Sequence, residues 1–260
     1  MKQELIKQVV KVGNTAGVLV PREWLNGKAK IILLEESLNM EKIRTEIFNM
    51  LSEYLPEIKA IILAGSYARG EQDSESDVEV IAISENLNKK LENGKFTIII
   101  IPENKLNEYL ESNAMPLLPM LREGKVLLNE TLVRNFTLKS INKKNIKWIA
   151  ETTESALNID KTFLDMDKEA EETECDDSVA YSLVLRLRGL LIIRACKKNK
   201  IFYNRELREI IKKITGNEVI YYQYRATKND KNLPKKASVA QAIKIYEYTR
   251  KMLEEVKKYE

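Results

Sequence analysis

One short stretch sets the strongest limit on how this 260-residue chain can fold. An apolar run of strand length, residues 58–64, ends at Gly65-Ser66, and two carboxylates follow at Asp77 and Glu79. A short apolar run bounded by turn residues is typical of a buried strand. Asp77 and Glu79 are two positions apart, so a strand through them presents both carboxylates on one face. The pattern therefore predicts core strands that bring a tight turn and an acidic pair together.

Each part of this pattern has a chemical use. Gly65 has no side chain that would keep a phosphate away from the backbone. Ser66 opens a short helical turn whose N–H groups, together with its hydroxyl, can hold phosphate oxygens. Asp77 and Glu79 repel one another unless a cation lies between them, and Mg²⁺ takes one or two carboxylates plus substrate phosphates. The sequence thus predicts a clamp for a magnesium-bound nucleoside triphosphate; the simpler alternative is an ordinary turn followed by a solvated acidic strand end.

These residues also resemble a known family. The segments Gly65-Ser66-Tyr67-Ala68-Arg69-Gly70 and Asp77-Val78-Glu79, with residues 121–128, resemble the minimal nucleotidyltransferases of the DNA polymerase β-like superfamily. The resemblance implies transfer of a nucleoside monophosphate from a nucleoside triphosphate such as ATP to a hydroxyl acceptor, with two Mg²⁺ ions. The acceptor stays open between a protein, an RNA and a small molecule, and the base is not predicted.

The resemblance also implies roles for single residues. It assigns Gly65, Ser66 and Arg69 to the nucleotide, and Asp77 and Glu79 to the metal and to catalysis. This chain departs from the family pattern in one respect, because active members carry a third carboxylate in the following strand.

Residues 96–101, the expected strand, contain no acid, and Glu103 lies just past them. Loss of the third carboxylate affects activation of the attacking hydroxyl more than it affects nucleotide binding. Two hypotheses therefore stay open: an active transferase, and a catalytically weakened nucleotide-binding regulator whose N-terminal segment binds DNA or a partner. A third is one half of a toxin–antitoxin pair.

The N-terminal segment, residues 1–36, reads as a small β unit. Strands are predicted at residues 9–12 and 18–20 around a Gly13-Asn14 turn, with a short helical piece and a further strand at 28–34. A piece of this size buries little surface by itself, so it needs the rest of the chain or a second copy.

Residues 12–15 and 18–23 resemble the AbrB/MazE-like swapped-hairpin family. The resemblance implies a homodimer formed by exchanged strands and DNA binding through basic residues, which makes Lys11 and Arg22 candidates for phosphate contact. The alternative is a hairpin used for dimerisation or packing that does not touch DNA.

The whole chain reads as an α+β protein in three parts: a hairpin domain at 1–36, a nucleotidyltransferase α/β core at 37–135, and an all-α bundle of four or five helices at 136–260. The α/β core is predicted from a helix at 40–55, strands at 58–64, 77–83, 95–101 and 125–128, and a helix at 104–112. The bundle resembles the HEPN or kanamycin-nucleotidyltransferase C-terminal kind. The nuclease versions of that bundle need a histidine, which this chain lacks.

Composition removes several classes of protein. The absence of histidine excludes Ser-His-Asp triads and HExxH zinc sites. Two cysteines, Cys175 and Cys196, are too few for a Cys-only zinc site or a disulfide framework, so reduced thiols are expected. We expect a cytoplasmic protein without a signal peptide or a membrane span, because the most apolar region is interrupted by arginines.

Charge is unevenly distributed along the bundle. Residues 151–180 carry a net charge of −9 and residues 181–260 carry +12. The basic part could attract nucleic acid or nucleotides, or its lysines could pair with the acidic stretch. The local aromatic-basic cluster at Tyr221, Tyr222, Tyr224 and Arg225 has the same two interpretations: a surface that stacks a base, or a helix edge half-buried in the bundle.

Overall fold

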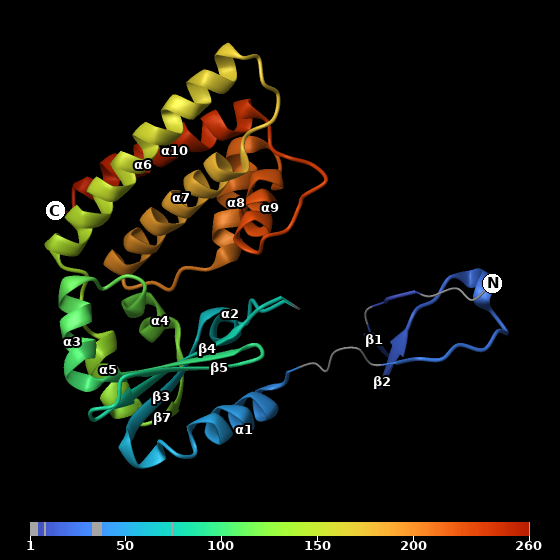
Figure 1. Ribbon diagram of the computed structural model, residues 1–260, viewed down its shortest axis with the longest axis vertical. Helices are drawn as coiled ribbons and strands as arrows, with labels where there is room; N and C mark the ends of the chain where they lie inside the picture. The colour runs from blue at the N-terminus through green and yellow to red at the C-terminus, as the bar shows by residue number, and fades with distance from the viewer. Residues whose placement is uncertain (1–4, 8, 33–37, 74, 260) are drawn as a thin grey trace. The chain divides into compact units, whose positions relative to one another are not determined.

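The computed structural model describes residues 5–7, 9–32, 38–73 and 75–259. The chain divides into two compact units, Met1–Met40 and Glu41–Glu260, and each is described by itself (Figure 1). The described part of the chain contains no helix with the length and apolar character that a bilayer crossing requires. The mixture of a hairpin, a mixed sheet and C-terminal helices is the α+β architecture that the sequence predicts.

The first unit is a two-stranded antiparallel hairpin followed by one turn of 3₁₀ helix. β1 (Val9–Val12) pairs with β2 (Thr15–Val18), and η1 spans Arg22–Trp24. None of its described residues from 5 to 32 is buried. The strand expected at 28–34 is wrong for residues 28–32, which have no regular structure, while residues 33 and 34 lie outside the described residues.

The second unit is built on a five-stranded mixed sheet with the order β5-β6-β4-β3-β7. Its strands are β3 (Ile58–Ala64), β4 (Val78–Ser84), β5 (Lys89–Asn93), β6 (Phe96–Pro102) and β7 (Lys125–Leu128). β4 and β6 run parallel and the other neighbours are antiparallel. Isoleucine and valine dominate β3, β4 and β6, whose buried side chains on both faces fit strands at the centre of a covered sheet.

Helices cover both faces of this sheet. On one face, Ile62 and Ile81 belong to a core that continues through α3 (Glu103–Ser112) and α4 (Leu117–Glu123) into the C-terminal helices. On the other face, α1 (Met40–Leu51) buries Ile43, Ile47 and Leu51, and its Glu46 accepts a hydrogen bond from Asn93 of β5 at 3.0 Å. Glu79 shares the alternation of Ile81, so it lies on the face that looks toward α4 and the bundle.

Several elements differ from the sequence prediction. The first helix ends at Leu51 rather than at Pro56, which instead lies in a short 3₁₀ turn, η2 (Leu55–Glu57). The sequence did not indicate β5, α4 or α5 (Glu130–Thr137). These three elements are short or, in α4, carry an internal proline, so periodicity gives a weak signal for them.

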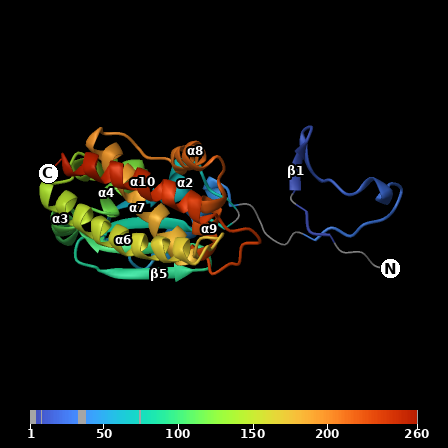
Figure 2. The ribbon, with the colours of Figure 1, turned by 90° about the horizontal axis from the view of Figure 1, so that it is seen from above.

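Five helices form the C-terminal bundle, within the predicted range (Figure 2). They are α6 (Lys143–Glu169), α7 (Asp177–Lys197), α8 (Asn204–Thr215), α9 (Val219–Lys228) and α10 (Val239–Lys257). Gly216 ends α8 at φ +85°, and Ser238 caps α10 in a capping box with Gln241. Acidic and basic segments do pair, because Glu154 of α6 contacts both Arg250 and Lys257 of α10.

Candidate functional site

The glycine turn and the second acid of the motif are in direct contact. Ala64 of β3 is the cross-strand partner of Glu79 in β4, and Gly65 turns the chain at φ +66° into the short helix α2 (Gly65–Arg69). A Cβ atom built on Gly65 would lie 2.0 Å from Oε2 of Glu79. The carboxylate of Glu79 therefore rests on the bare Cα of Gly65, a position that only glycine leaves open.

Ser66 and Asp77 flank this contact. Ser66 is half-buried in α2, and its carbonyl closes the helix by accepting the N–H of Glu71 at 2.9 Å. Asp77 is exposed at the entry to β4, where the N–H of Val78 bonds the carbonyl of Lys95 at 2.8 Å. Asp77 and Glu79 form no ion pair with any lysine or arginine that the structure describes. Both carboxylates are thus open to a cation from outside the chain.

A third carboxylate does not join this pair. In the parallel β4–β6 register, Thr97 lies beside Glu79 and Ile99 beside Ile81. Glu103 follows the far end of β6, because Pro102 pairs with the last residue of β4, and it binds Nζ of Lys59 at 3.2 Å. Within the described ranges, no group of three acidic or cysteine side chains could hold a metal ion.

One further acid shares the row of Glu79 across the sheet. Glu92 of β5 is the partner of Thr97, which is itself the partner of Glu79. Two strand spacings separate the backbones of Glu79 and Glu92 by roughly 10 Å. Glu92 is exposed and pairs with Lys90 at 2.6 Å. It lies on the same face of the sheet as Glu79, but on the edge strand β5.

Arg69 is held by two carboxylates. Its Nε binds Oε2 of Glu71 at 2.9 Å and its Nη1 binds Oε1 of Glu123 at 2.6 Å. The arginine side chain is 8% exposed, so both carboxylates neutralise it inside the protein. Through Glu123, Arg69 ties α2 to α4. The assignment of Arg69 to the nucleotide, which the family resemblance implies, stays a prediction.

Glu123 is a residue of this region that the sequence did not single out. It accepts the N–H of Gly65, so it holds the backbone of the turn at the residue on which Glu79 rests. Burial raises the pKa of the Glu123 carboxyl above its ordinary value, although the positive charges of Arg69 and Arg188 act against the shift. Its position in the Leu121–Leu128 segment that resembles the family was the available signal.

Glu71 connects the turn region to the helical bundle. Its Oε2 accepts the N–H of Asn204 at 3.0 Å and its Oε1 accepts the N–H of Arg205 at 3.2 Å. These are free N–H groups of the first turn of α8, so a carboxylate from the α/β part caps a bundle helix. The same carboxylate binds Arg69, which makes Glu71 the link between α2 and α8.

The segment between α2 and Asp77 has a second attachment, at the end of α9. Nη1 of Arg225 binds Oδ2 of Asp73 at 2.8 Å, and Nζ of Lys231 binds Oε1 of Glu75 at 2.5 Å. Partial burial acts to raise the pKa of Asp73, but hydrogen bonds from Arg225 and Ser76 and the charge of Arg225 lower it overall. The bundle thus holds the chain that joins the two halves of the motif.

The aromatic-basic cluster of α9 is mostly internal. Tyr221 and Tyr224 are buried, and Tyr224 stacks on Tyr181 of α7 with ring centroids 5.3 Å apart. Tyr222 is the exposed member, at 46%. The structure therefore shows the half-buried helix edge rather than an open stacking surface, with Arg225 engaged by Asp73.

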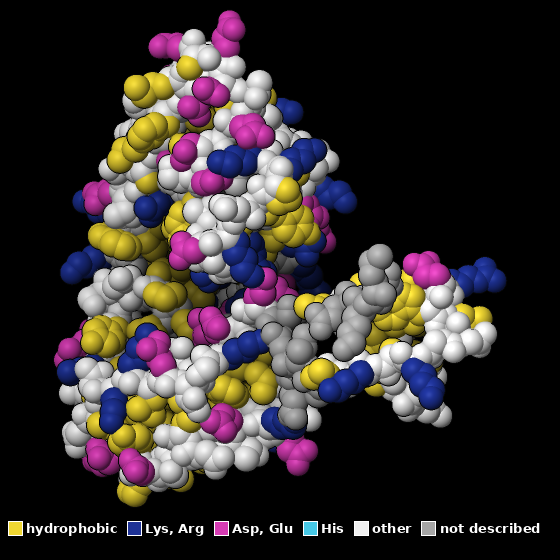
Figure 3. Space-filling view, turned by 45° about the vertical axis from the view of Figure 1, so that its right-hand side comes forward, with side chains coloured by type: hydrophobic (Ala, Val, Ile, Leu, Met, Phe, Trp, Pro, Cys, Tyr) yellow, Lys and Arg dark blue, Asp and Glu magenta, His cyan; other side chains and the backbone are white. Residues whose placement is uncertain are grey.

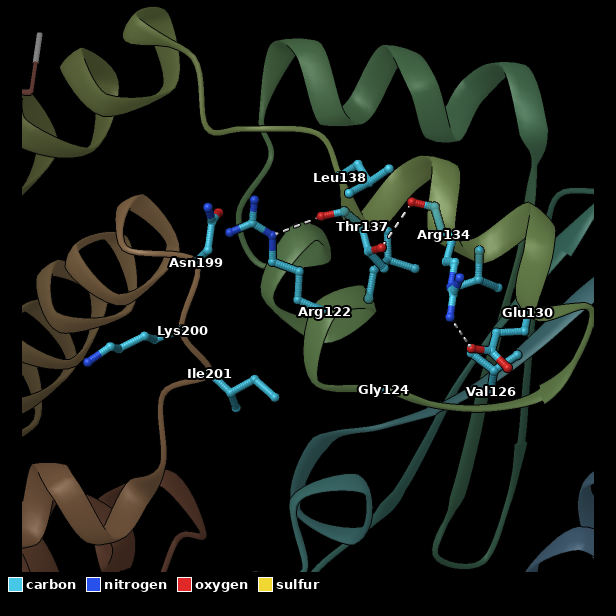
Figure 4. Close-up of a pocket in the computed structure, with 12 residues that line it drawn as sticks. Arg122, Gly124, Val126, Glu130, Arg134, Thr137, Leu138, Asn199, Lys200 and Ile201 are labelled. Atoms are coloured by element: carbon cyan, nitrogen blue, oxygen red, sulfur yellow. Dashed lines mark hydrogen bonds and ion pairs between the residues drawn. The ribbon is translucent and has the colours of Figure 1, made fainter.

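A surface cavity of about 580 Å³ lies elsewhere, between α4, α5 and the segment after α7 (Figure 4). Arg122 lines it but donates to three carbonyls, those of Thr137, Lys139 and Cys196. Arg134, also in the wall, pairs with Glu130. None of the motif residues lines this cavity, so it is separate from the glycine–carboxylate site.

In the first unit, Lys11 and Arg22 are both exposed, and neither has an ion-pair partner within the described residues. Lys11 lies in β1 opposite Ala16, and Arg22 begins η1. Both side chains are accessible, as the hairpin resemblance requires of a phosphate contact.

Comparisons with known proteins agree with this geometry. Residues 44–160 match the family described as Nucleotidyltransferase domain. A Methanocaldococcus jannaschii protein named "Putative protein adenylyltransferase" is 45% identical over 49 residues, which are 18% of this chain and 49% of that protein. The chain thus spans about half the length of that curated relative.

Two solved structures are also similar. The first is a nucleotidyltransferase-like protein from Exiguobacterium sibiricum (TM-score 0.36, 12% identity, covering 84% of this chain and 75% of that one). The second is a spectinomycin adenyltransferase from Enterococcus faecialis solved with ATP and spectinomycin (TM-score 0.45, 13% identity, covering 83% of this chain and all of that one).

The domain match covers the sheet, the short helices packed on it and the first part of α6. The match over residues 44–160 supports the nucleotidyltransferase superfamily for that part of the chain. Swapped-hairpin and HEPN relationships for the two ends of the chain stay predictions.

Proposed function

We propose that this chain is a Mg²⁺-dependent nucleotidyltransferase that moves a nucleoside monophosphate from a nucleoside triphosphate to a hydroxyl acceptor. The observation that carries the proposal is the contact between Glu79 Oε2 and the Cα of Gly65, because it brings the glycine turn and an acid of the motif together. The acceptor oxygen would attack the α-phosphorus, the α–β phosphoanhydride bond would break, and pyrophosphate would leave. The acceptor proton would pass to solvent.

Asp77 and Glu79 fit one Mg²⁺ ion that arrives with the nucleotide. Mg²⁺ needs one or two carboxylates and takes its other ligands from water and phosphate. Asp77 and Glu79 would supply these carboxylates, because both are exposed and neither has an ion-pair partner among the described residues. When bound, the ion would neutralise phosphate charge. The chain's own contribution is to hold the pair against the Gly65 turn, where Ser66 can donate to a phosphate oxygen.

The alternative function is a nucleotide-binding regulator with weakened catalysis. Thr97 favours it, because a threonine and not a carboxylate lies beside Glu79 in β6. The exposed hairpin favours it as well, since an accessible basic unit with no buried residue would suit DNA through Lys11 and Arg22, or a second copy. In this case the chain would bind magnesium nucleotide without transferring it.

One experiment separates the two functions. The full chain is incubated with Mg²⁺ and with ATP labelled either at the α- or at the γ-phosphate, together with a cell extract. ATP is tested first because the matched relative is named an adenylyltransferase. Label from the α-position alone indicates nucleotidyl transfer. Digesting the product with protease or nuclease, or dialysing it, then assigns the acceptor to protein, RNA or small molecule.

Variants and binding data complete the test. Asp77→Asn and Glu79→Gln should abolish transfer, while Glu75→Gln, which removes a carboxylate that serves Lys231, should retain most of it. Calorimetry with ATP and Mg²⁺ runs in parallel. Binding without transfer would favour the regulator, and the absence of any nucleotide affinity would overturn both functions. A gel shift with wild-type and Lys11→Ala chains tests the DNA contact separately.

A further inference from the structure

Helix α6 carries large apolar side chains on its solvent side along most of its length. Trp148, Ile159, Phe163 and Met166 are 53%, 57%, 49% and 59% exposed. At about 100° per residue, these four positions lie within about 60° of one another around the helix. They extend over roughly 27 Å from the first to the last. They lie on one side of the helix, with Thr152 and Ser155 between Trp148 and the other three, and we call this side the α6 stripe.

The opposite side of α6 is the side that packs in the bundle. Its buried residues include Ile146, Ile149, Leu157 and Leu164, and α6 contacts α7 and α10. A helix with apolar residues on two opposite faces is normally covered on both. Within the second unit α6 runs along the outer edge of the bundle, as Figures 1 and 2 show, and hydrophobic side chains reach the surface of that unit in Figure 3. Within the described part of the second unit, the four apolar side chains of the stripe are therefore about half exposed.

Charge indicates what covers it. α6 begins with Lys143, Lys144 and Lys147 and ends with Asp165, Asp167 and Glu169, so its two ends have opposite sign. Lys144 and Glu169 are exposed on the same flank of the stripe, and neither has an ion-pair partner in the part of the chain that the structure describes. The charges at the two ends of α6 are therefore complementary to those of a second α6 helix that runs in the opposite direction.

The spacing of these residues fits a two-fold axis. Lys144 and Glu169 are equally far from the middle of the helix near Leu157, and Trp148 and Met166 are symmetric about almost the same point. When two α6 helices pack antiparallel about this point, Trp148 of one copy meets Met166 of the other. Lys144 then meets Glu169 on the same flank. A parallel pair would instead place like charges together.

We propose that the α6 stripe is the interface of a homodimer in which the α6 helices of two copies of this chain pack antiparallel. The occupant is a second copy because an antiparallel pair places Trp148 on Met166 and Lys144 on Glu169, whereas a parallel pair places Lys144 on Lys144 and Glu169 on Glu169. The interface is independent of the nucleotide site, so either proposal can fail without the other.

Sedimentation velocity of the full chain over a range of concentrations tests the proposal. Because the hairpin could also join two copies, the measurement is made in a Val10→Asp background. We expect this variant to be dimeric and the added change Phe163→Asp to raise the dimer dissociation constant roughly 30-fold or more, as loss of a central anchor does. Leu138→Asp is the matched control, because Leu138 is 81% exposed but lies outside α6. Circular dichroism confirms that each variant is folded.

Charge reversal tests the direction of packing. Lys144→Glu and Glu169→Lys should each weaken the dimer, and the double variant should restore it, because the reversed charges still meet in an antiparallel pair. A double variant as weak as the two single variants would overturn the antiparallel arrangement. A Val10→Asp chain that is monomeric at every concentration, or one in which Phe163→Asp changes nothing, would overturn the interface itself.

Discussion

Oε2 of Glu79 occupies the space in which a side chain on Gly65 would begin, 2.0 Å from the position of a Cβ atom. This contact joins the end of β3 to the start of β4 and gives the proposed site its shape. It also means that Gly65 is required for two separate reasons, a positive φ of +66° and the lack of space for a methyl group. The two requirements affect different properties of the protein, so they can be measured apart.

Gly65→Ala should damage the site more than the fold. Alanine at positive φ costs about 1 kcal/mol or slightly more. The clash adds little to this, because the displaced atom is the end of a flexible carboxylate side chain. We expect a modest loss in the free energy of unfolding by urea but loss of Mg²⁺–ATP binding, since Glu79 must swing away from the turn.

Gly94→Ala is the matched control for this prediction. Gly94 also has a positive φ, +55°, but a Cβ there meets nothing within 4 Å. It should lose about the same stability as Gly65→Ala and keep nucleotide binding. If both variants bind Mg²⁺–ATP as the wild type does, Glu79 has no role in holding the nucleotide.

Arg69→Ala should destabilise the chain strongly. The change leaves the buried carboxylate of Glu123 without its closest positive partner, a loss of about 3–5 kcal/mol for a buried ion pair. Arg134→Ala, which breaks an exposed pair with Glu130 at 75% and 69% exposure, should cost at most about 0.5 kcal/mol. Chemical denaturation of the two variants compares the sites, and equal losses would contradict the structural role of Arg69.

The stability of Arg69→Ala should also depend on pH. Burial already raises the pKa of Glu123 in the folded protein, and removal of Arg69 raises it further. A group whose pKa is higher in the folded than in the unfolded protein stabilises the fold below its unfolded pKa. This stabilisation is lost as the pH rises through the pKa of the folded protein. The amount by which the free energy of unfolding of Arg69→Ala falls below that of the wild type should therefore be larger at pH 8 than at pH 5.

The sequence predicted the part of the site that depends on neighbours along the chain. The Gly65 turn follows the apolar run of β3, and Asp77 and Glu79 lie at the start of the apolar run of β4, so local pattern indicates where each part lies. Their contact follows from the antiparallel pairing of β3 with β4. The role of Arg69 was not predictable in this way. Its partner Glu123 lies 54 residues away, on a helix that the sequence did not indicate.

Long-range contacts also explain what the sequence missed elsewhere. Glu71 caps α8, which begins 133 residues further along the chain. This contact depends on how the bundle packs on the sheet, so the local sequence does not indicate it. The Thr97–Glu79 neighbour pair needs the parallel β4–β6 register. The end of α8 at Gly216 and the start of α10 at Ser238 depend only on the adjacent helical turn, so a local pattern can indicate them.

Neither cysteine should react in the folded protein. Cys175 is 1% exposed, and burial, with the negative charges of Asp167 and Asp176, raises its pKa to about 12. Burial also raises the pKa of Cys196, although Arg122 opposes the shift. Because the thiolate is the reactive form, a maleimide at pH 8 should label the protein only after denaturation. Rapid labelling of the native chain, read by mass spectrometry, would show that the protein opens locally around Cys196 in α7 or around Cys175 in the connection between α6 and α7.

Arg225 should control the mobility of the segment that leads into Asp77. Its guanidinium is 34% exposed and Asp73 is 44% exposed, so the pair contributes about 1 kcal/mol or less. Arg225→Ala should nevertheless increase amide hydrogen exchange in residues 70–77, while Arg225→Lys, which keeps the charge, should change it less. Lys228→Ala is the control, because Lys228 ends the same helix and is exposed.

The pH dependence of this contact has a definite sign. The folded pKa of Asp73 lies below the ordinary value of 3.8, so its contribution to stability is present above that value and is lost as the pH falls through the folded pKa. The stability difference between the wild type and Arg225→Ala should therefore hold from pH 7 to about pH 5 and shrink in more acidic solution. Denaturation curves at pH 7, 5 and 3 measure it. A difference that grows on acidification would mean that Arg225 stabilises the fold through a contact other than Asp73.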